Sequence, residues 1–306
     1  MKVIITGGAG FIGSNIADLL IDKGLEVVII DNLSHGKKQN INPKAKFYNC
    51  DIRDSKILEI FQKEKPQVLI HEAAQISVPN SVDDPINDAS INIIGTLNLL
   101  EACRKTGVKR VIYPASAAIF GEPEYLPIDE KHPLNMMSGY GVTKHTVEHY
   151  LSVYKSLYGI DYVALRYANV YGPRQDSSGE GGVVAIFSEK LIKNEIPYIY
   201  GDGQQIRDFV YVKDVAKANF MALTSGDNEI FNVSTNQKIS INDLLNVVNS
   251  ALGRNIKAVY TDERPGDIRN SYMSYDKIKN ALGWTPDYNL EAGIAETIEY
   301  YKSSDL

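Results

Sequence analysis

The sequence predicts an α/β protein built on a doubly wound, mainly parallel β-sheet, with a smaller α/β unit after it. Three observations lead to this fold class. Through the first half of the chain, short β-branched runs alternate with segments whose apolar residues recur at helical spacing, which is the pattern of successive βαβ units. The β-branched runs are almost wholly apolar, as strands covered on both faces must be. The first run leads directly into a glycine-rich turn.

The first 32 residues contain a strand, a glycine turn, a helix and a second strand that ends on an acid. The strands are Lys2–Thr6 and Glu26–Ile30, and Ser14–Lys23 has helical spacing. The turn between them, Gly7–Gly13, lets backbone N–H groups and a helix N-terminus approach a pyrophosphate. Asp31 ends the second strand, where a carboxylate binds ribose hydroxyls and repels the additional phosphate of NADP. Together these features predict a Rossmann-type site for NAD.

The alternation of strand and helix continues beyond this unit. Further strands are predicted at Lys46–Asn49, Gln67–His71, Arg110–Tyr113 and Asp161–Arg166. Further helices are predicted at Asp54–Glu64, Pro85–Lys105 and Ser138–Tyr158. Right-handed crossovers bring the carboxyl ends of the strands to one edge of the sheet, which is where ligands bind. The residues expected at that edge are Gly7, Asp31, Asp51, His71 and Ser116.

The pattern changes after Tyr171-Gly172-Pro173. Gln175–Gly182 is polar and rich in glycine, and we expect it to be a mobile loop. Shorter helices are predicted to begin at Gly182, Lys213 and Ser240, with short strands at Pro197–Tyr200 and Ala258–Tyr260. We therefore expect an NAD-binding domain at 1–172, to which part of 207–235 returns. Residues 173–306 are expected to form a substrate domain that closes over the cofactor.

Composition excludes several classes of partner. The formal charge is −6 and there is no basic run, which argues against nucleic acid or an anionic membrane surface. No apolar stretch approaches the ~20 residues of a membrane span, and Met1 leads straight into a strand, so we expect no signal peptide and a cytoplasmic protein. Cys50 and Cys103 give no disulfide framework, and Cys103 is expected in the core. The five histidines lack metal-ligand spacing, so no metal is expected, and His145 and His149 are interpreted as surface residues.

Tyr140 and Lys144 lie one helical turn apart on a predicted helix, and therefore on one face. A free tyrosine, with a pKa near ~10, is a poor base at neutral pH. A neighbouring ammonium and an oxidised nicotinamide both favour the phenolate. Tyr275 and Lys279 share the spacing in a chain of 19 tyrosines, so the spacing alone does not identify a catalytic pair. Glycines in the segment before Tyr140 and Ser116 at an upstream strand end favour the first pair, and the second is interpreted as structural.

Several motifs resemble those of the extended short-chain dehydrogenase/reductases. The general ones are Thr6–Ser14, Asp31-Asn32-Leu33, Ser116–Gly121 and Tyr140–Lys144. Those that narrow the resemblance to the nucleotide-sugar epimerase branch are Leu165–Arg174, Arg207–Val212 and Arg264-Pro265-Gly266-Asp267. The resemblance runs from Met1 to about Trp284, and it is closest to the UDP-glucose 4-epimerases and their relatives that act on N-acetylhexosamines.

The resemblance implies an NAD-dependent 4-epimerisation of UDP-hexoses through a transient 4-keto sugar. It makes Tyr140 the base for the sugar 4-OH, Ser116 a hydrogen-bond partner of that oxygen, and Lys144 a ligand of the nicotinamide ribose. The implied cofactor contacts are Gly7, Gly10, Phe11, Ile12, Asp31, Asn32, Gly36, Asp51, Ile52, Ala73, Gln75, Asn92, Tyr140, Lys144 and Tyr167. The implied substrate contacts are Ser116, Tyr140, Asn169, Val184, Tyr198, Tyr200, Arg207, Arg264, Asp267 and Ser271, with the arginines at the diphosphate and the two tyrosines Tyr198 and Tyr200 at the uracil.

Two positions bear on which reaction and which sugar. Dehydratases and decarboxylases of this family carry an acid two residues after the active-site serine or threonine, and here that position is Ala118. Members of this family have a gate residue beside the C2 substituent of the sugar, large in some members and small in others. Counting seven residues on from Arg264 places Ser271 at this position. A small residue there leaves room for an N-acetyl group, which predicts activity on UDP-glucose and UDP-galactose and also on UDP-GlcNAc and UDP-GalNAc. Because Tyr272 is the next residue, an alignment shifted by one position would place a large residue at the gate instead.

Two other functions are considered. A UDP-hexuronate 4-epimerase would use the same chemistry, but it would need a cation near C6 that the sequence does not reveal. A non-catalytic NAD-sensing scaffold would have lost the Tyr/Lys pair that this chain keeps. The resemblance also implies a homodimer, formed through helices 85–105 and 138–158.

Overall fold

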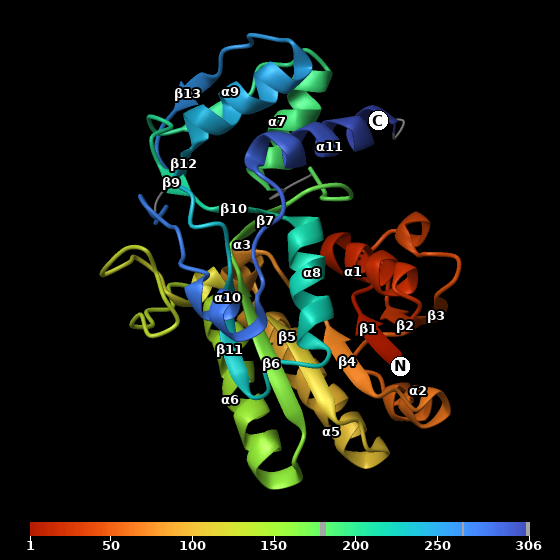
Figure 1. Cartoon of the computed structure of the whole chain (residues 1–306). Helices are drawn as coiled ribbons and strands as arrows, with labels where there is room; N and C mark the ends of the chain where they lie inside the picture. The colour runs from red at the N-terminus through yellow and green to blue at the C-terminus, as the bar shows by residue number, and fades with distance from the viewer. Residues whose placement is uncertain (178–181, 265, 304–306) are drawn as a thin grey trace.

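The computed structural model describes residues 1–177, 182–264 and 266–303. A seven-stranded parallel sheet lies at the centre of this described part, in the strand order β11-β6-β5-β4-β1-β2-β3 (Figure 1). Its strands are β1 (Lys2–Thr6), β2 (Glu26–Asp31), β3 (Lys46–Asn49), β4 (Val68–His71), β5 (Arg110–Ser116), β6 (Asp161–Tyr167) and β11 (Glu229–Val233). The order reverses between β1 and β4, which is the switch point where such sheets bind ligands. The predicted fold class is confirmed.

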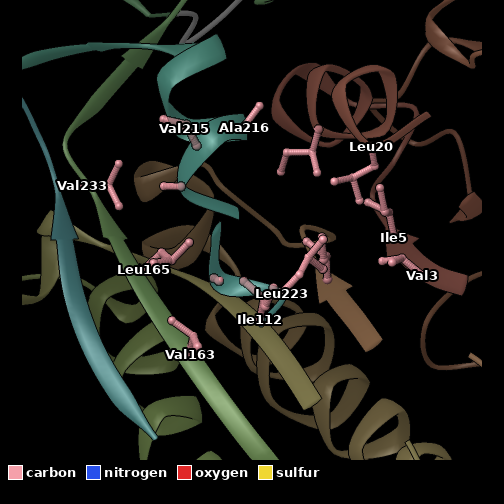
Figure 2. Close-up of a cluster of buried hydrophobic side chains, with 14 of the residues drawn as sticks. Val3, Ile5, Leu20, Ile112, Val163, Leu165, Val215, Ala216, Leu223 and Val233 are labelled. Atoms are coloured by element: carbon pink, nitrogen blue, oxygen red, sulfur yellow. The ribbon is translucent and has the colours of Figure 1, made fainter. Parts of the chain in front are cut away.

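Helices cover both faces of the sheet because successive side chains of each strand point to opposite faces. Val3 and Ile5 of β1 pack on one side with Leu20, in a cluster that Figure 2 shows. The helices of that side are α1 (Phe11–Asp22), α8 (Val212–Ala222) and α10 (Asp276–Leu282). Ile4 packs on the other side with Leu99. The helices of that side are α2 (Lys56–Glu64), α5 (Thr96–Thr106) and α6 (Gly139–Tyr158). Cys103 lies in this second cluster with 0% exposure, as predicted.

The segment predicted as one long helix, Pro85–Lys105, is interrupted. It consists of α4 (Pro85–Ala89), a wider π turn at 90–95 and then α5. The hydroxyl of Thr96, the first residue of α5, donates to the carbonyl oxygen of Asn92 in this π turn at 2.6 Å. A short helix that the sequence did not predict, α3 (Val78–Asp83), precedes it. π turns concentrate at functional sites, and this one carries a predicted site residue, Asn92.

The C-terminal elements form a second apolar cluster, drawn at the top of Figure 1, from α7 (Val183–Ile192), α9 (Ile241–Leu252) and α11 (Leu290–Ser303). Three two-stranded sheets accompany them. Their strands are β7 (Asn169–Tyr171) with β10 (Phe209–Tyr211), β8 (Tyr198–Tyr200) with β13 (Val259–Thr261), and β9 (Ile206–Arg207) with β12 (Ile239–Ser240). Gly182 and Ser240 cap the helices predicted to begin there. The expected loop at 175–182 lies partly outside the described residues.

The chain crosses from the second cluster back to the main sheet between Phe209 and Val233. α8 packs against α1, and β11 then joins the sheet beside β6. This path supports the expected return of part of 207–235, while the division into two domains stays a prediction. Within the described ranges no helix combines the length and the apolarity that a membrane crossing needs.

Candidate active site

The glycine turn after β1 adopts a conformation that only glycine fits. Gly7 has a φ of +69°, and a Cβ added there would lie 2.6 Å from the backbone nitrogen of Ala73. A Cβ at Gly13 would lie 2.3 Å from the carbonyl oxygen of Gly7. Helix α1 begins at Phe11, three residues earlier than predicted, and Gly10 caps it without a side-chain hydrogen bond or an acid in the first turn. Its N-terminal N–H groups are therefore placed to bind an anion such as a pyrophosphate.

Asp31 lies at the carboxyl end of β2, beside this turn. It is 8% exposed, and its carboxylate accepts hydrogen bonds from the N–H groups of Ala9 (3.0 Å) and Leu33 (2.8 Å). A Cβ added at Gly36 would lie 2.9 Å from its Oδ1, so the loop passes close to the carboxylate. Each carboxylate oxygen can accept a further bond. The residues present therefore fit a ribose with free hydroxyls, as in NAD.

A second acid, Asp51, follows the neighbouring strand β3. Its carboxylate accepts bonds from Nδ2 of Asn32 (3.0 Å) and from Nε (2.9 Å) and Nη2 (2.8 Å) of Arg53. The bonds from Arg53, above all, hold the pKa of Asp51 well below its usual range. Ile52 lies against the π turn, where a Cβ on Gly95 would meet its Cδ1 at 2.5 Å. The predicted cofactor residues Asn32, Asp51 and Ile52 thus lie next to Asp31 on adjoining strand ends.

Asn92 and Gln75, two predicted cofactor contacts, belong to a buried network. The Asn92 side chain bonds both backbone groups of Gln75, the N–H at 2.9 Å and the carbonyl at 3.1 Å. It also donates to Asp88 (3.0 Å) and Thr143 (3.1 Å), and Thr143 and Gln75 both donate to Asp88 at 2.8 Å. This amide is engaged within the protein, and its direct contact with a cofactor stays a prediction. The observed role of the network is to tie the loop after β4 to α6, and no motif in the sequence pointed to Asp88.

Ser116, Tyr140 and Lys144 come together at the carboxyl end of β5. Ser138 caps α6 by accepting from the N–H of Gly141 at 3.2 Å, which places Tyr140 and Lys144 in the helix's first turns. The hydroxyls of Tyr140 and Ser116 are hydrogen-bonded. Burial raises the pKa of Tyr140, while the bond to Ser116 opposes that rise. The phenol therefore needs a nearby positive charge before it can act as a base.

Lys144, one turn further along α6, is the predicted source of that charge. Its side chain is buried, and Nζ lies 4.5 Å from the ring centroid of Tyr113, a cation–π arrangement. Burial lowers the pKa of Lys144, and the neighbouring carboxyl groups oppose this. Tyr167, a predicted cofactor contact at the end of β6, is 6% exposed, and its hydroxyl donates to Glu72 at 2.9 Å. Glu72 follows β4 and was missed by the sequence interpretation.

Helix α6 is anchored to β6 by a buried ion pair. Glu148 accepts from Nε (2.9 Å) and Nη2 (2.8 Å) of Arg166, and both side chains are nearly inaccessible to solvent. His145 lies 3.0 Å from Glu148 and 3.0 Å from His149. The interpretation of His145 as a surface residue was therefore wrong: its side chain is only 18% exposed, because it packs onto Glu148. His149 is exposed, as predicted.

The predicted diphosphate residues lie on the C-terminal elements. Arg207 of β9 is paired with Asp267 at 2.5 Å. The next residue, Asp208, is 1% exposed and accepts from the N–H groups of Thr235 (2.9 Å) and Met273 (3.2 Å). Burial raises the pKa of Asp208. Asp208 thereby fixes the strand of Arg207 against the segment that contains the predicted gate.

The remaining predicted substrate residues do not all have free side chains. The guanidinium of Arg264 stacks on Tyr200, 3.9 Å from the ring centroid, and Tyr198 is 53% exposed on the same strand. Asn169 is exposed on β7. Val184 is 1% exposed and packs in the apolar cluster of the C-terminal helices. Because of this packing, its backbone is the part left for contact, and the contact of Val184 with the substrate stays a prediction.

The gate position can be judged from the packing of two neighbours. Tyr272 is 8% exposed, Lys238 lies 4.8 Å above its ring, and its carbonyl accepts from the N–H of Ile128 at 3.0 Å. Ser271 is half-buried, and its N–H donates to the carbonyl of Ile206 at 3.1 Å. Tyr272 is thus held in packing of its own, which favours Ser271 as the gate.

The structure also separates the two Tyr/Lys pairs. Tyr275 lies at the start of α10, and its ring stacks edge-on against Trp284 at 5.9 Å. This second pair is therefore part of the packing around α10.

Ala118 lies beside the active-site serine, and its N–H donates to Oγ of Ser116 at 3.2 Å. Among the described residues, no group of three or more histidines, cysteines or acids is arranged to hold a metal ion.

Comparison with known proteins gives a consistent result. Residues 3–234 match the model of the NAD dependent epimerase/dehydratase family. The UDP-glucose 4-epimerase of Thermotoga maritima, solved with UDP-glucose, is 45% identical, with a TM-score of 0.97 and 99% of each chain covered. That of Thermus thermophilus, solved with NAD, is 42% identical, with a TM-score of 0.94 over 99% of this chain and 100% of that one.

A third structure extends the comparison to acetylated sugars. The UDP-N-acetylglucosamine 4-epimerase of Methanobrevibacter ruminantium, in complex with UDP-N-acetylmuramic acid, is 38% identical, with a TM-score of 0.94 over 99% of this chain and 98% of that one. The family match covers most of the chain and includes the glycine turn, Asp31, Ser116 and the Tyr140–Lys144 pair. This chain therefore belongs to the NAD dependent epimerase/dehydratase family, and its cofactor is NAD.

Proposed function

We propose that this protein is a UDP-hexose 4-epimerase. The observation that carries the proposal is the cluster of Ser116, Tyr140 and Lys144 at the carboxyl edge of the sheet, next to the residues that fit NAD. Ala118 stands where dehydratases and decarboxylases of the family place an acid, and its small apolar side chain offers no second proton-transfer group. A site with one proton-transfer group and a bound NAD supports oxidation and reduction at one carbon without a further elimination step.

The bound cofactor supplies a hydride acceptor and donor for C4 of the sugar. Tyr140 takes the proton of the 4-hydroxyl, and Ser116 holds that oxygen through its own hydroxyl. Lys144 lowers the free energy of the Tyr140 phenolate by its charge. When the 4-keto sugar is reduced on its opposite face, Tyr140 returns the proton. The two half-reactions thus use the same groups in opposite directions.

The keto sugar must turn over between the two half-reactions, so the hexose has to be held loosely while the nucleotide is held firmly. Arg207 and Arg264 are the candidate diphosphate ligands, because a guanidinium forms paired, charge-assisted bonds with phosphate oxygens. Tyr198 and Tyr200 offer aromatic faces for the uracil. In this arrangement binding energy comes from the part of the substrate that does not react.

The proposed function is tested by incubating the purified protein separately with UDP-glucose, UDP-galactose, UDP-GlcNAc, UDP-GalNAc and UDP-glucuronate, and separating the products. We expect the first four to interconvert in pairs and the uronate to remain unchanged. Conversion of UDP-glucuronate alone would favour the hexuronate 4-epimerase instead. Binding of NAD with no conversion of any sugar would favour the non-catalytic scaffold.

Replacing Ser271 by Tyr is expected to remove activity on the acetylated pair selectively. A bulky ring beside the sugar C2 would occupy the space of an N-acetyl group, whereas a hydroxyl would still fit. The measurement is kcat/KM for UDP-GlcNAc and for UDP-glucose in the same preparation, with Ser271→Ala as the small-residue control. An equal effect of Ser271→Tyr on both substrates would show that this residue is not the gate.

We further propose that the protein is a cytoplasmic homodimer. Both cysteines are buried and unpaired, as is usual in a reducing compartment. Exposed apolar side chains gather on α4, the π turn and α6, namely Ile86, Ile94, Val142, Val153 and Leu157. A second copy that packs its α6 against this face would cover them. Leu157→Glu, with the exposed Lys63→Glu on α2 as control, should yield monomers in sedimentation, and an unchanged dimer would contradict this interface.

A further inference from the structure

Asp18 on helix α1 joins two segments from distant parts of the chain. Its Oδ2 is paired with Nη2 of Arg174 at 2.6 Å, and its Oδ1 accepts a hydrogen bond from Nδ2 of Asn42 at 2.7 Å. Arg174 follows β7, whereas Asn42 belongs to the connection between β2 and β3. One carboxylate on the helix that follows the glycine turn therefore holds both segments, and neither contact has a role in the function described so far.

The first of these segments, residues 36–42, is also fastened to the glycine turn itself. The N–H of Lys37 (3.0 Å) and Nδ2 of Asn40 (3.1 Å) both donate to the carbonyl oxygen of Ala9. The N–H of Ala9 in turn donates to Asp31, the acid that fits the ribose of NAD. The 36–42 segment therefore borders the part of the site where the ribose and pyrophosphate are expected.

The second segment, residues 173–175, bridges α1 and the C-terminal elements. On one side, Nδ2 of Asn15 on α1 donates to the carbonyl oxygen of Pro173 at 3.3 Å. On the other side, the carbonyl oxygen of Gln175 accepts from the hydroxyl of Tyr301 on α11 at 2.5 Å. The 173–175 segment is thus attached at both ends, and the ion pair of Arg174 with Asp18 lies between these attachments.

The backbone of Arg174 shows that its position is imposed by its contacts. Its φ is +73°, in the left-handed region that residues other than glycine rarely adopt and that costs them conformational energy. Its side chain is 23% exposed, and among the described residues its Nη1 is buried without a hydrogen-bond partner. The ion pair with Asp18 therefore compensates for the partial burial of this guanidinium and holds the strained residue against α1.

We propose that Asp18 is a positioning residue that slows the escape of NAD, because it holds the 36–42 and 173–175 segments against α1. NAD leaves the glycine turn only when these segments move away from the helix, so their attachment sets how long it stays. The purpose of this retention rests on the proposed function. A 4-epimerase uses the same cofactor in both half-reactions, and loss of the cofactor between them would strand the keto sugar.

The test measures how fast bound NAD exchanges with an excess of isotopically labelled NAD, in protein purified with NAD and without any sugar. Asp18→Asn removes the charge, but its amide oxygen can still accept from Asn42. We expect exchange roughly threefold faster, as the loss of a partly exposed ion pair predicts. Asp18→Ala loses both contacts and should exchange roughly tenfold faster. Arg174→Gln should match Asp18→Asn, and combining these two changes should accelerate exchange no further.

Asp161→Asn is the matched control. Asp161 also pairs with one cation, Lys155 at 2.6 Å, and accepts from one amide, Asn228 at 3.1 Å. It begins β6, at the edge of the sheet opposite the glycine turn. This variant should lower the free energy of unfolding about as much as Asp18→Asn does, and it should leave the exchange of NAD unchanged. Arg174→Lys keeps the charge and should exchange NAD more slowly than Arg174→Gln.

Exchange in Asp18→Asn and Arg174→Gln that is as slow as in Asp161→Asn would overturn the proposal, even if all three variants were less stable, because a purely structural role predicts only that loss. Additive acceleration in the double variant would overturn it as well, since the two groups would then act separately. The measurement needs no sugar. It can therefore fail independently of the proposed function, which fails if no UDP-sugar is converted.

Discussion

Tyr140→Phe is expected to lower kcat for UDP-glucose roughly a thousandfold, within the range that one positioned acid–base group supplies. The variant keeps the ring and loses the hydroxyl that is bonded to Ser116. No proton acceptor then remains at the sugar 4-oxygen. NAD binding should persist, because the glycine turn and Asp31 are untouched. The measurements are kcat and the amount of NAD bound per chain.

Tyr275→Phe is the matched control for this experiment. Tyr275 also precedes a lysine by one helical turn, but it packs on Trp284. Its loss should leave kcat unchanged. Activity of Tyr140→Phe close to that of the unaltered protein would show that another group takes the 4-OH proton.

Glu148→Ala is expected to destabilise the protein by about 3–5 kcal/mol, the cost of leaving a buried charge without its partner. The Arg166 guanidinium would remain in a nearly solvent-free site between α6 and β6. The free energy of unfolding from urea titration is the measurement. Kinetic parameters of the surviving folded fraction should also worsen, because α6 carries Tyr140 and Lys144.

Two variants calibrate this loss. Glu101→Ala removes a carboxylate that is paired with Arg104 at 2.7 Å on the surface of α5, and it should cost at most about 1 kcal/mol. Replacing both buried partners, Glu148→Leu with Arg166→Met, should restore most of the lost stability, since apolar residues carry no desolvation penalty. A loss in Glu148→Ala no larger than in Glu101→Ala would contradict the role of the pair.

The central sheet could be predicted because burial on both faces leaves a local signal, an apolar β-branched run such as Val3–Ile5. β11 was not predicted as a strand of this sheet. Its run, Glu229–Val233, includes the polar residues Glu229 and Asn232, and its pairing with β6 links residues far apart in the chain. The π turn could not be predicted either, because it forms together with the contacts of Asn92 to Gln75 in the loop after β4 and to Thr143 of α6.

The candidate site divides in the same way. Asp31, Ser116, Tyr140 and Lys144 belong to contiguous motifs, so the sequence alone identifies them. Glu72 has no motif that reveals its role. The fold alone brings it to the hydroxyl of Tyr167, at the end of β6. α11 was not predicted, although Leu290, Ile294 and Ile298 have the spacing of one helix face and the sequence therefore carries a local signal for it.

The transfer of hydride away from C4 and back to the same carbon can be observed directly with UDP-glucose that carries deuterium at C4. After many turnovers in ordinary water, we expect the UDP-galactose formed to retain the deuterium at C4, because hydride moves only between the sugar and bound NAD. Loss of the label to solvent, or epimerisation that proceeds without any cofactor bound, would contradict this mechanism.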